Sequence, residues 1–290
     1  MEADGPTRAR EAGRRDRSRP PDPEPLPVAV PDSHCHLDIA DGEWLPTEQA
    51  LARAADANVT RIVQIGCDLT GAAWAVQVAA SHPSVVAGVA LHPNEVPRLV
   101  EQGGLDDAFA QIESLATDNE RVRAVGETGL DYYRTGESGR AAQHDSFRRH
   151  VDLSRRLGKT LVIHDRDAHD DVLAILDEQG VPDRFVMHCF SGGADFARAC
   201  LDRGGYLSFA GTVTFKNAEP VRDALRYAPR DRVLVETDAP YLTPTPYRGR
   251  PNASYLVPLT VRSMAETRGD DLAELCAAID ANTDAAFGAW

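Results

Sequence analysis

The sequence predicts an α/β fold, a (β/α)8 TIM barrel in a single domain, and three observations support this prediction. From Pro27 onwards, short apolar runs rich in β-branched residues alternate with stretches of helical period. Eight such apolar runs are present, the number of strands in a closed parallel barrel. The 290 residues suit a barrel of this kind, and no change in composition marks a second domain. An open doubly wound sheet is the alternative, but no GxGxxG sequence follows the first strand.

The predicted strands are short and mostly apolar, as expected for strands that are covered on both faces. In chain order they are PVAVPDSH (27–34), TRIVQIG (60–66), SVVAGVALH (84–92), VRAVGET (122–128), TLVIHD (160–165), RFVMHCF (184–190), GYLSFAG (205–211) and RVLVETD (232–238). The predicted helices between and after them cover 47–58, 141–158, 170–180, 193–205 and 270–288. In the second of these helices, Phe147 and Val151 share one face and Gly158 is suited to the C-cap.

The distribution of charge separates the first residues from the rest of the chain. The formal net charge is −14. Residues 1–27 contain six arginines and six acidic residues, so the whole negative net charge lies in the part of the chain expected to fold. An acidic body argues against a broad basic groove for long nucleic acids. It does not exclude a phosphate substrate, because bound divalent cations can invert the local charge.

We interpret residues 1–26, which are rich in proline and arginine, as a disordered N-terminal extension, and residues 27–290 as the barrel. No apolar run approaches the length of a membrane span, and hydrophobic residues make up 42% of the chain. The five cysteines are odd in number and form no CxxC pair, which favours a reducing compartment and a cytoplasmic protein. No obligate protein partner is evident from the sequence.

Residues with metal-binding or acid–base chemistry gather at the ends of the predicted strands. They are His34, His36, His92, Glu127, His164, His188 and Asp238. In a parallel barrel, the carboxyl ends of all strands open onto one mouth, where active sites lie. Burying this many imidazoles and carboxylates without a cation would be costly, so the pattern indicates a metal site. The four histidines in or beside helices, His82, His144, His150 and His169, are expected on the surface.

The spacing of His34 and His36 has a direct structural meaning. Residues i and i+2 of a strand point to the same face, so both rings should point into the barrel and Cys35 outward. This orientation argues against a structural zinc site that uses the cysteine. The donor set is too large for one tetrahedral ion and suits two divalent cations that share a carboxylate.

Six motifs resemble the TatD family of metal-dependent deoxyribonucleases, which belongs to the amidohydrolase-like metallo-barrels. They are DSHCHLD, GETGLDYYR, LVIHDRDA, HCFSG, LSFAGTVTFKNA and VLVETDAPYLTP, and the resemblance covers about residues 28 to 287. It implies that His34, His36, Glu127 and Asp238 hold one metal ion. His164 and His188 would hold a second, with Glu127 as the bridge.

The resemblance also implies an activity, a 3′–5′ exonuclease on single-stranded DNA that uses a water activated by two cations, Mg²⁺, Mn²⁺ or Zn²⁺. Asp238 is the candidate general base, and Glu127 joins it as a catalytic residue. Phosphate contacts are expected from His92, Arg134, Arg166 and Lys216, and base stacking from Tyr132 or Tyr133. Alternatives are another ester or amide hydrolase, such as a D-aminoacyl-tRNA deacylase or a phosphatase, and a non-catalytic metal-binding protein.

Overall fold

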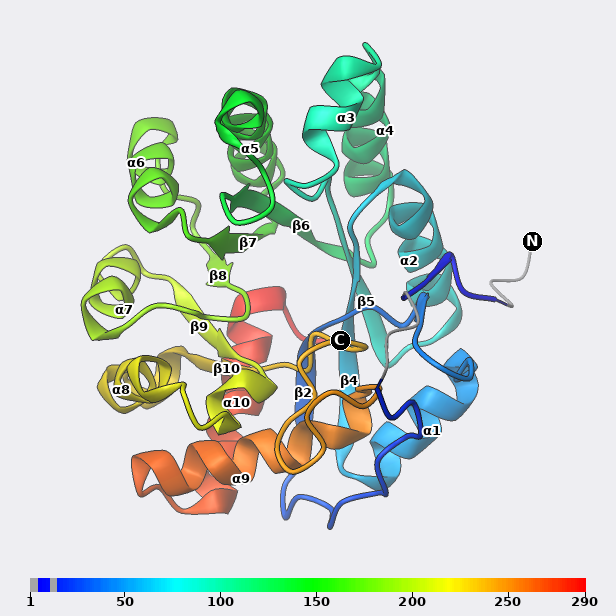
Figure 1. The fold of residues 1–290 in the computed structure, drawn as a ribbon, viewed down its shortest axis with the longest axis vertical. Helices are drawn as coiled ribbons and strands as arrows, with labels where there is room; N and C mark the ends of the chain where they lie inside the picture. Colours follow the sequence, from blue (N-terminus) through cyan, green and yellow to red (C-terminus); the bar gives the residue numbers. More distant parts are fainter. Residues whose placement is uncertain (1–4, 11–14) are drawn as a thin grey trace.

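The structure is a computed structural model that describes residues 5–10 and 15–290, and it confirms the predicted barrel (Figure 1). Eight parallel strands form one sheet in the order β10-β9-β8-β7-β6-β5-β4-β2. Their bounds are β2 Val30–Cys35, β4 Val59–Gly66, β5 Val85–Val89, β6 Val122–Asp131, β7 Thr160–Arg166, β8 Phe185–Met187, β9 Tyr206–Phe209 and β10 Val233–Val235. The barrel closes where the backbone of Cys35 bridges that of Ala239, in the segment that follows β10.

Helices form an outer ring around the strands (Figure 1). Their bounds are α1 Thr47–Asp56, α2 Leu69–Ser81, α3 Val96–Glu101, α4 Leu105–Asp118, α5 Glu137–Leu157, α6 His169–Gln179, α7 Ala194–Leu201, α8 Glu219–Tyr227, α9 Val257–Arg268 and α10 Leu272–Phe287. The predicted C-cap is present, because Gly158 ends α5 in the left-handed conformation that glycine adopts without steric cost. Within the described residues, no helix combines the length and apolar character needed to cross a membrane.

Two apolar cores stabilise the barrel. The larger lies between the strands and the helices, where Phe147 and Val151 of α5 are both fully buried. The smaller lies inside the barrel and contains Val63, Val86, Val162 and Leu234, among others. The C-terminal end of α10 joins this inner core through Ala286 and Phe287 and so covers the amino ends of the strands. The polar site therefore lies at the opposite, carboxyl end.

Strands β6 and β7 approach each other unusually closely beside the site. Gly129 in β6 has a φ of 137°, and a Cβ at this position would lie 2.1 Å from the carbonyl oxygen of His164. No other residue type fits such an approach, so the glycine of the GETGLD motif is required by packing. The close approach sets the end of β7, which carries His164, beside the end of β6, which carries Glu127.

The described part of the N-terminal extension lies against the barrel, where the sequence had led us to expect disorder over 1–26. β1 Arg8–Ala9 pairs in parallel with β3 Ile39–Ala40, which follows β2. Further along, the hydroxyl of Tyr255 donates to the carbonyl oxygen of Pro20 at 2.7 Å. A disordered extension therefore does not describe residues 5–10 and 15–26. The sequence alone could not show this, because the contacts join the extension to β3, 31 residues further along the chain, and to Tyr255, 235 residues from Pro20.

Candidate metal centre

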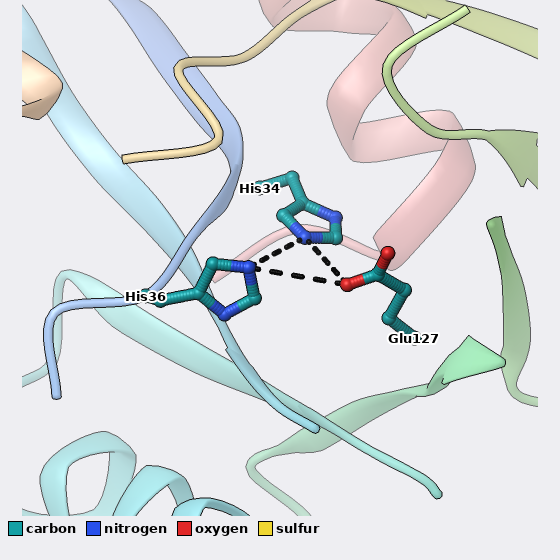
Figure 2. A group of neighbouring side chains, drawn as sticks. All are labelled: His34, His36 and Glu127. Atoms are coloured by element: carbon teal, nitrogen blue, oxygen red, sulfur yellow. Dashed lines mark hydrogen bonds and ion pairs between the residues drawn. The ribbon is translucent and has the colours of Figure 1, made fainter. Parts of the chain in front are cut away.

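His34 and His36 place two imidazoles at the carboxyl end of β2, as their spacing predicts (Figure 2). Their Nε2 atoms lie 3.3 Å apart, and both side chains are buried. The Nδ1 of His36 lies 2.9 Å from the carbonyl oxygen of Ile65. This contact fixes the ring and leaves Nε2 as the free donor atom for a metal. Cys35 belongs to the core between strands and helices and so lies away from both rings.

Asp238 joins these two histidines through the pairing that closes the barrel. Its backbone N–H donates to the carbonyl oxygen of His34 at 2.9 Å, and the N–H of His36 donates to Ala239 at 2.8 Å. The Oδ1 atom of Asp238 consequently lies 3.3 Å from Nε2 of His36 and 4.0 Å from Nε2 of His34. Residues more than 200 positions apart in the chain thus contribute to one group of ligand atoms.

Glu127 lies between two groups of histidines and faces each with a different oxygen. Its Oε2 atom lies 3.5 Å from Nε2 of His34 and 3.9 Å from Nε2 of His36 (Figure 2). Its Oε1 atom lies 2.6 Å from Nδ1 of His164, 3.1 Å from Nε2 of His188 and 3.4 Å from Nε2 of His92. One carboxylate with each oxygen directed at a separate donor group is the arrangement that a bridged pair of cations requires.

The electrostatics of this cluster also suit a cation. Burial lowers the pKa of the His34 ring from 6.5 to about 3, so this imidazole is neutral and its nitrogens are available as ligands. Burial acts against ionisation of Glu127 too, but the neighbouring His188 and His92 hold its pKa well below the usual range. A buried, ionised carboxylate therefore faces several imidazoles. Divalent cations in the same place would stabilise that charge more strongly than protons on the rings.

The donor atoms meet the geometric requirement for metal binding. His34, His36 and Glu127 offer ligand atoms that all lie within 4.8 Å of one another, and so do His92, Glu127 and His164. Nitrogen and carboxylate oxygen donors of this kind bind Zn²⁺, Mn²⁺ and related divalent ions. Nδ1 of His34 is buried without a hydrogen-bond partner among the described residues. The residues present therefore fit a metal centre with two positions.

All six ligands predicted from the motifs surround this centre, and His92 is nearer to it than expected. We assigned His92 to substrate binding, whereas its ring lies with Glu127 and His164 in the second donor group. Its Nδ1 accepts a hydrogen bond from the backbone N–H of Asn94, so its Nε2 points toward the carboxylate. Phosphate could reach His92 only in the immediate neighbourhood of the metal positions.

The sequence reasoning missed two carboxylates that hold ligand histidines in place. Nδ1 of His188 lies 2.8 Å from Oε1 of Glu236, and Nε2 of His164 lies 3.3 Å from Oδ2 of Asp131. Both carboxylates are buried. Outer partners of this kind orient a metal-binding imidazole and raise its basicity. The available signals were the acidic residue two positions before Asp238 and the aspartate that ends the GETGLD motif.

Two further polar residues lie beside the ligand residues. Asp32 accepts hydrogen bonds from the backbone N–H of His34 and from Thr237. It thereby ties β2 to the segment after β10, and burial raises its pKa to about 6. Cys67, which the sequence did not single out, donates from Sγ to Oε2 of Glu127 at 3.4 Å.

The cations predicted to bind phosphate lie at or after the ends of different strands around the mouth. Arg134 follows β6, Arg166 ends β7 and Lys216 follows the 3₁₀ helix Gly211–Thr214, and all three are exposed. Tyr132 is engaged in hydrogen bonds with His144 and Asp171. By contrast, Tyr133 is 66% exposed, and the guanidinium carbon of Arg166 lies 3.9 Å from its ring centre. Of the two tyrosines, Tyr133 is the one available to a ligand.

An eight-stranded barrel with these donors at the carboxyl ends of its strands defines a class of protein, the metal-dependent barrel hydrolases. The family model described as "TatD related DNase" matches residues 31–288. The chain belongs to this TatD family of metal-dependent hydrolases.

Individual proteins show the same relationship. "Uncharacterized metal-dependent hydrolase TatD" of Mycobacterium tuberculosis is 42% identical over 262 residues, 89% of this chain and 97% of that protein. "Uncharacterized metal-dependent hydrolase YcfH" of Escherichia coli K12 is 41% identical over 84% of this chain and 90% of its own length. Among solved structures, the TatD homolog YJJV of Escherichia coli K12 superimposes with a TM-score of 0.81 at 26% identity, covering 90% of this chain and 98% of YJJV.

Proposed function

We propose that this protein is a deoxyribonuclease that removes nucleotides from the 3′ end of single-stranded DNA. The observation that carries the proposal is the division of Glu127 between two donor groups, one oxygen facing each. Such a site is suited to clamp both the attacking and the leaving oxygen of a phosphodiester. The family description as TatD-related DNase supports the same substrate class.

The chain's own groups would carry out distinct parts of this hydrolysis. Divalent cations, when bound, supply charge stabilisation and a nucleophilic water at neutral pH. Asp238 is the most open carboxylate of the centre, because its side chain is 15% exposed whereas that of Glu127 is 4% exposed. We therefore assign Asp238 as the group that accepts the proton from the attacking water, and Glu127 as the group that holds the two metal positions together.

Substrate recognition would use the loops around the mouth. Arg134, Arg166 and Lys216 are exposed cations beyond or at the ends of three different strands, so they can reach several phosphate oxygens. Tyr133, with the Arg166 guanidinium on its ring, offers a flat exposed surface for one base. Stacking of this kind tolerates any base and suits an enzyme that trims without sequence preference.

The alternatives named above use the same centre. A D-aminoacyl-tRNA deacylase or a phosphatase could be built on the same metal centre, because ligand atoms do not identify a substrate. A non-catalytic metal-binding protein would use Asp238 only as a ligand and not as a proton acceptor. The cytoplasm is the compartment we propose, which the five unpaired cysteines support.

The decisive experiment strips the protein with a chelator and offers single-stranded DNA labelled at either end with Mg²⁺, Mn²⁺ or Zn²⁺. Loss of nucleotides from the 3′ end is expected with at least one metal and not without. His34→Ala should abolish it, whereas His82→Ala, at the end of α2, should not. The proposal fails if no metal restores cleavage or if His34→Ala behaves like wild type. Aminoacyl-tRNA and phosphomonoester substrates would then separate the alternatives.

A further inference from the structure

The N-terminal extension places an arginine-rich segment beside the mouth of the barrel. We call residues 7–10 and 15–17 the arginine arm. β1 within it pairs with β3, and the Thr7 side chain donates to Oδ2 of Asp38 at 2.6 Å. Asp38 follows the two ligand histidines by two residues. In Figure 1 the dark-blue arm accordingly lies near the loop that follows β10.

Three guanidinium groups of the arm converge on one buried carboxylate, that of Asp41. Arg15 binds it with two nitrogens at 2.6 and 2.7 Å. Arg10 approaches to 3.3 Å and Arg17 to 4.0 Å. Three positive charges around one negative charge leave a local excess of two. In a chain whose net charge is −14, this local excess of positive charge is an exception.

Most donors of this cluster are not used inside the protein. Among the described residues, Arg17 makes no side-chain hydrogen bond, and Arg8 only approaches Asp68, at 3.6 Å. Arg10 donates through one nitrogen, at 3.3 and 3.4 Å, which are long distances. The side chains of Arg8, Arg10 and Arg17 are 40%, 34% and 37% exposed, whereas that of Arg15 is 18% exposed. Arg15 therefore anchors the arm. The side chains of Arg8, Arg10 and Arg17 are partly exposed and keep nitrogens without partners among the described residues, although Nε of Arg17 is itself buried.

The arm adjoins the metal centre through two residues that follow Asp238. Arg10 donates to the carbonyl oxygen of Pro240, and its guanidinium carbon lies 4.9 Å from the ring centre of Tyr241. That ring in turn packs edge-on against His36, with 6.3 Å between the ring centres. A polyanion that reaches Asp238 from this side must pass the arm. The cations named earlier, Arg134, Arg166 and Lys216, lie at or after the ends of other strands.

We propose that Arg8, Arg10 and Arg17 bind backbone phosphates of the single strand whose 3′ end lies at the metal centre. The arm would thereby extend the substrate site by several nucleotides beyond the reacting phosphodiester. This inference rests on the proposed nuclease function. It predicts an effect on the binding of long substrates and none on the chemical step, because the arm does not touch the reacting atoms.

The test compares two triple variants that change the net charge equally. The first is Arg8→Gln, Arg10→Gln and Arg17→Gln, with Arg15 retained so that buried Asp41 keeps its closest partner. The matched control is Arg148→Gln, Arg149→Gln and Arg156→Gln, three arginines of α5 that pair with surface carboxylates. A third protein carries lysine at positions 8, 10 and 17. Fluorescence anisotropy measures binding of a labelled strand of about twelve nucleotides in chelator, as a function of salt concentration.

The glutamine arm variant should bind the strand about tenfold more weakly at low salt. Its slope of log affinity against log salt should fall by about 2, because each phosphate contact on a single strand contributes roughly 0.7. The control triple should match wild type, and the lysine variant should keep most of the slope. Turnover of a small chromogenic phosphodiester should be equal in all four proteins.

Two results would overturn the arm proposal alone. In one, the glutamine arm variant binds DNA as the control triple does. In the other, it binds or cleaves DNA better than wild type, which would mean that the arm shields the mouth. If wild type cleaves no DNA with any metal, the nuclease function fails instead, and the metal-free binding data still report on the arm. Thermal unfolding of each variant shows whether the fold is intact.

Discussion

The two ends of the barrel interior differ in chemistry although the same strands build them. At the amino end, Val162, Val186 and Leu234 point inward and contribute to an apolar core that α10 covers. Two residues further along the same faces stand His164, His188 and Glu236. A period of two keeps each side-chain pair on one face, so position along the strand alone decides between core and site. Substitutions at the amino end should therefore affect folding, and those at the carboxyl end should affect function.

Glu127→Gln should have the largest effect on function. The amide keeps the size of the side chain but removes the negative charge that faces both donor groups. We expect activity with saturating metal to fall about a thousandfold or more, with little change in the melting temperature of the metal-free protein. Steady-state kinetics and isothermal titration with Mn²⁺ measure the two consequences. Two metal ions bound with wild-type affinity would contradict the bridging role.

Phe287→Ala is the corresponding change at the amino end. Phe287 is 3% exposed and belongs to the core inside the barrel, so truncation leaves a cavity there. The free energy of unfolding should fall by about 3–5 kcal/mol, as measured by urea denaturation. Tyr227→Ala, an exposed side chain on α8, should change it by less than about 0.5 kcal/mol. Well below the melting temperature, the activity per folded molecule of Phe287→Ala should equal that of wild type. A loss of activity in fully folded Phe287→Ala would show that the amino end of the barrel also contributes to function.

His150 concerns both stability and function, because it is buried beside the residue that precedes His92. The prediction that it lies on the surface was wrong. It is fully buried in α5, where its Nδ1 lies 2.7 Å from the carbonyl oxygen of Ser146. Its Nε2 accepts from the backbone N–H of Leu91, the residue before His92. Burial lowers the pKa of His150 from 6.5 to about 4. Between pH 6.5 and about 4, the ring is thus neutral in the folded protein and charged in the unfolded chain.

Stability should consequently fall as the pH drops from 6.5 to 4. In this window the unfolded chain binds the proton and the folded protein does not, so the free energy of unfolding rises with pH. The contribution of His150 is about 3 kcal/mol at most. Urea denaturation of wild type and of His150→Gln at several pH values gives the free energy of unfolding against pH for each protein. The difference between the slopes of these two plots is the contribution of His150 to the pH dependence. Parallel slopes would show that His150 does not titrate in this way.

The sequence predicted most of the barrel because period and position act locally. All eight strands occur where the apolar runs predicted them, and the inward histidines of β7 and β8 follow from a period of two. Glu127 does not follow from this period, since Ala124 of the same strand already points inward. A register shift between β6 and β7, from Val125 to Thr128, turns it toward the site. No local pattern in the sequence announces that shift.

The residues missed in the site depend on partners distant in the chain. Asp131 of β6 holds a ring from the neighbouring strand β7, whereas Glu236, after β10, holds the ring of His188, after β8, with β9 between the two strands. Both roles become visible only when the barrel has formed. His150 resembled a surface residue because arginines precede it in a polar helix, but its neighbours Phe147 and Val151 already marked the buried face. The arm was missed because an arginine- and proline-rich stretch carries no apolar pattern.

Glu236→Gln should have the smallest effect among these predictions. It tests how far metal binding depends on the carboxylate that holds the His188 ring in place. Glu236 accepts from the backbone N–H of Cys189 at 3.0 Å and lies 2.8 Å from Nδ1 of His188. Burial alone would lower the pKa of His188, but the carboxylates of Glu236 and Glu127 raise it well above its usual range. Glutamine can keep a hydrogen bond but not the charge, so His188 becomes a weaker ligand.

We expect metal affinity to fall about 10- to 100-fold in this variant, while activity recovers at high metal concentration. Glu236→Ala should not recover, because Cys189 and His188 would both lose their partner and the ring would be free to turn. Cleavage measured against Mn²⁺ concentration separates the two variants. A Glu236→Gln protein with the wild-type metal requirement would show that hydrogen bonding alone supports His188. The carboxyl end would then tolerate the loss of the buried charge on Glu236, although it should not tolerate the loss of the charge on the ligand Glu127.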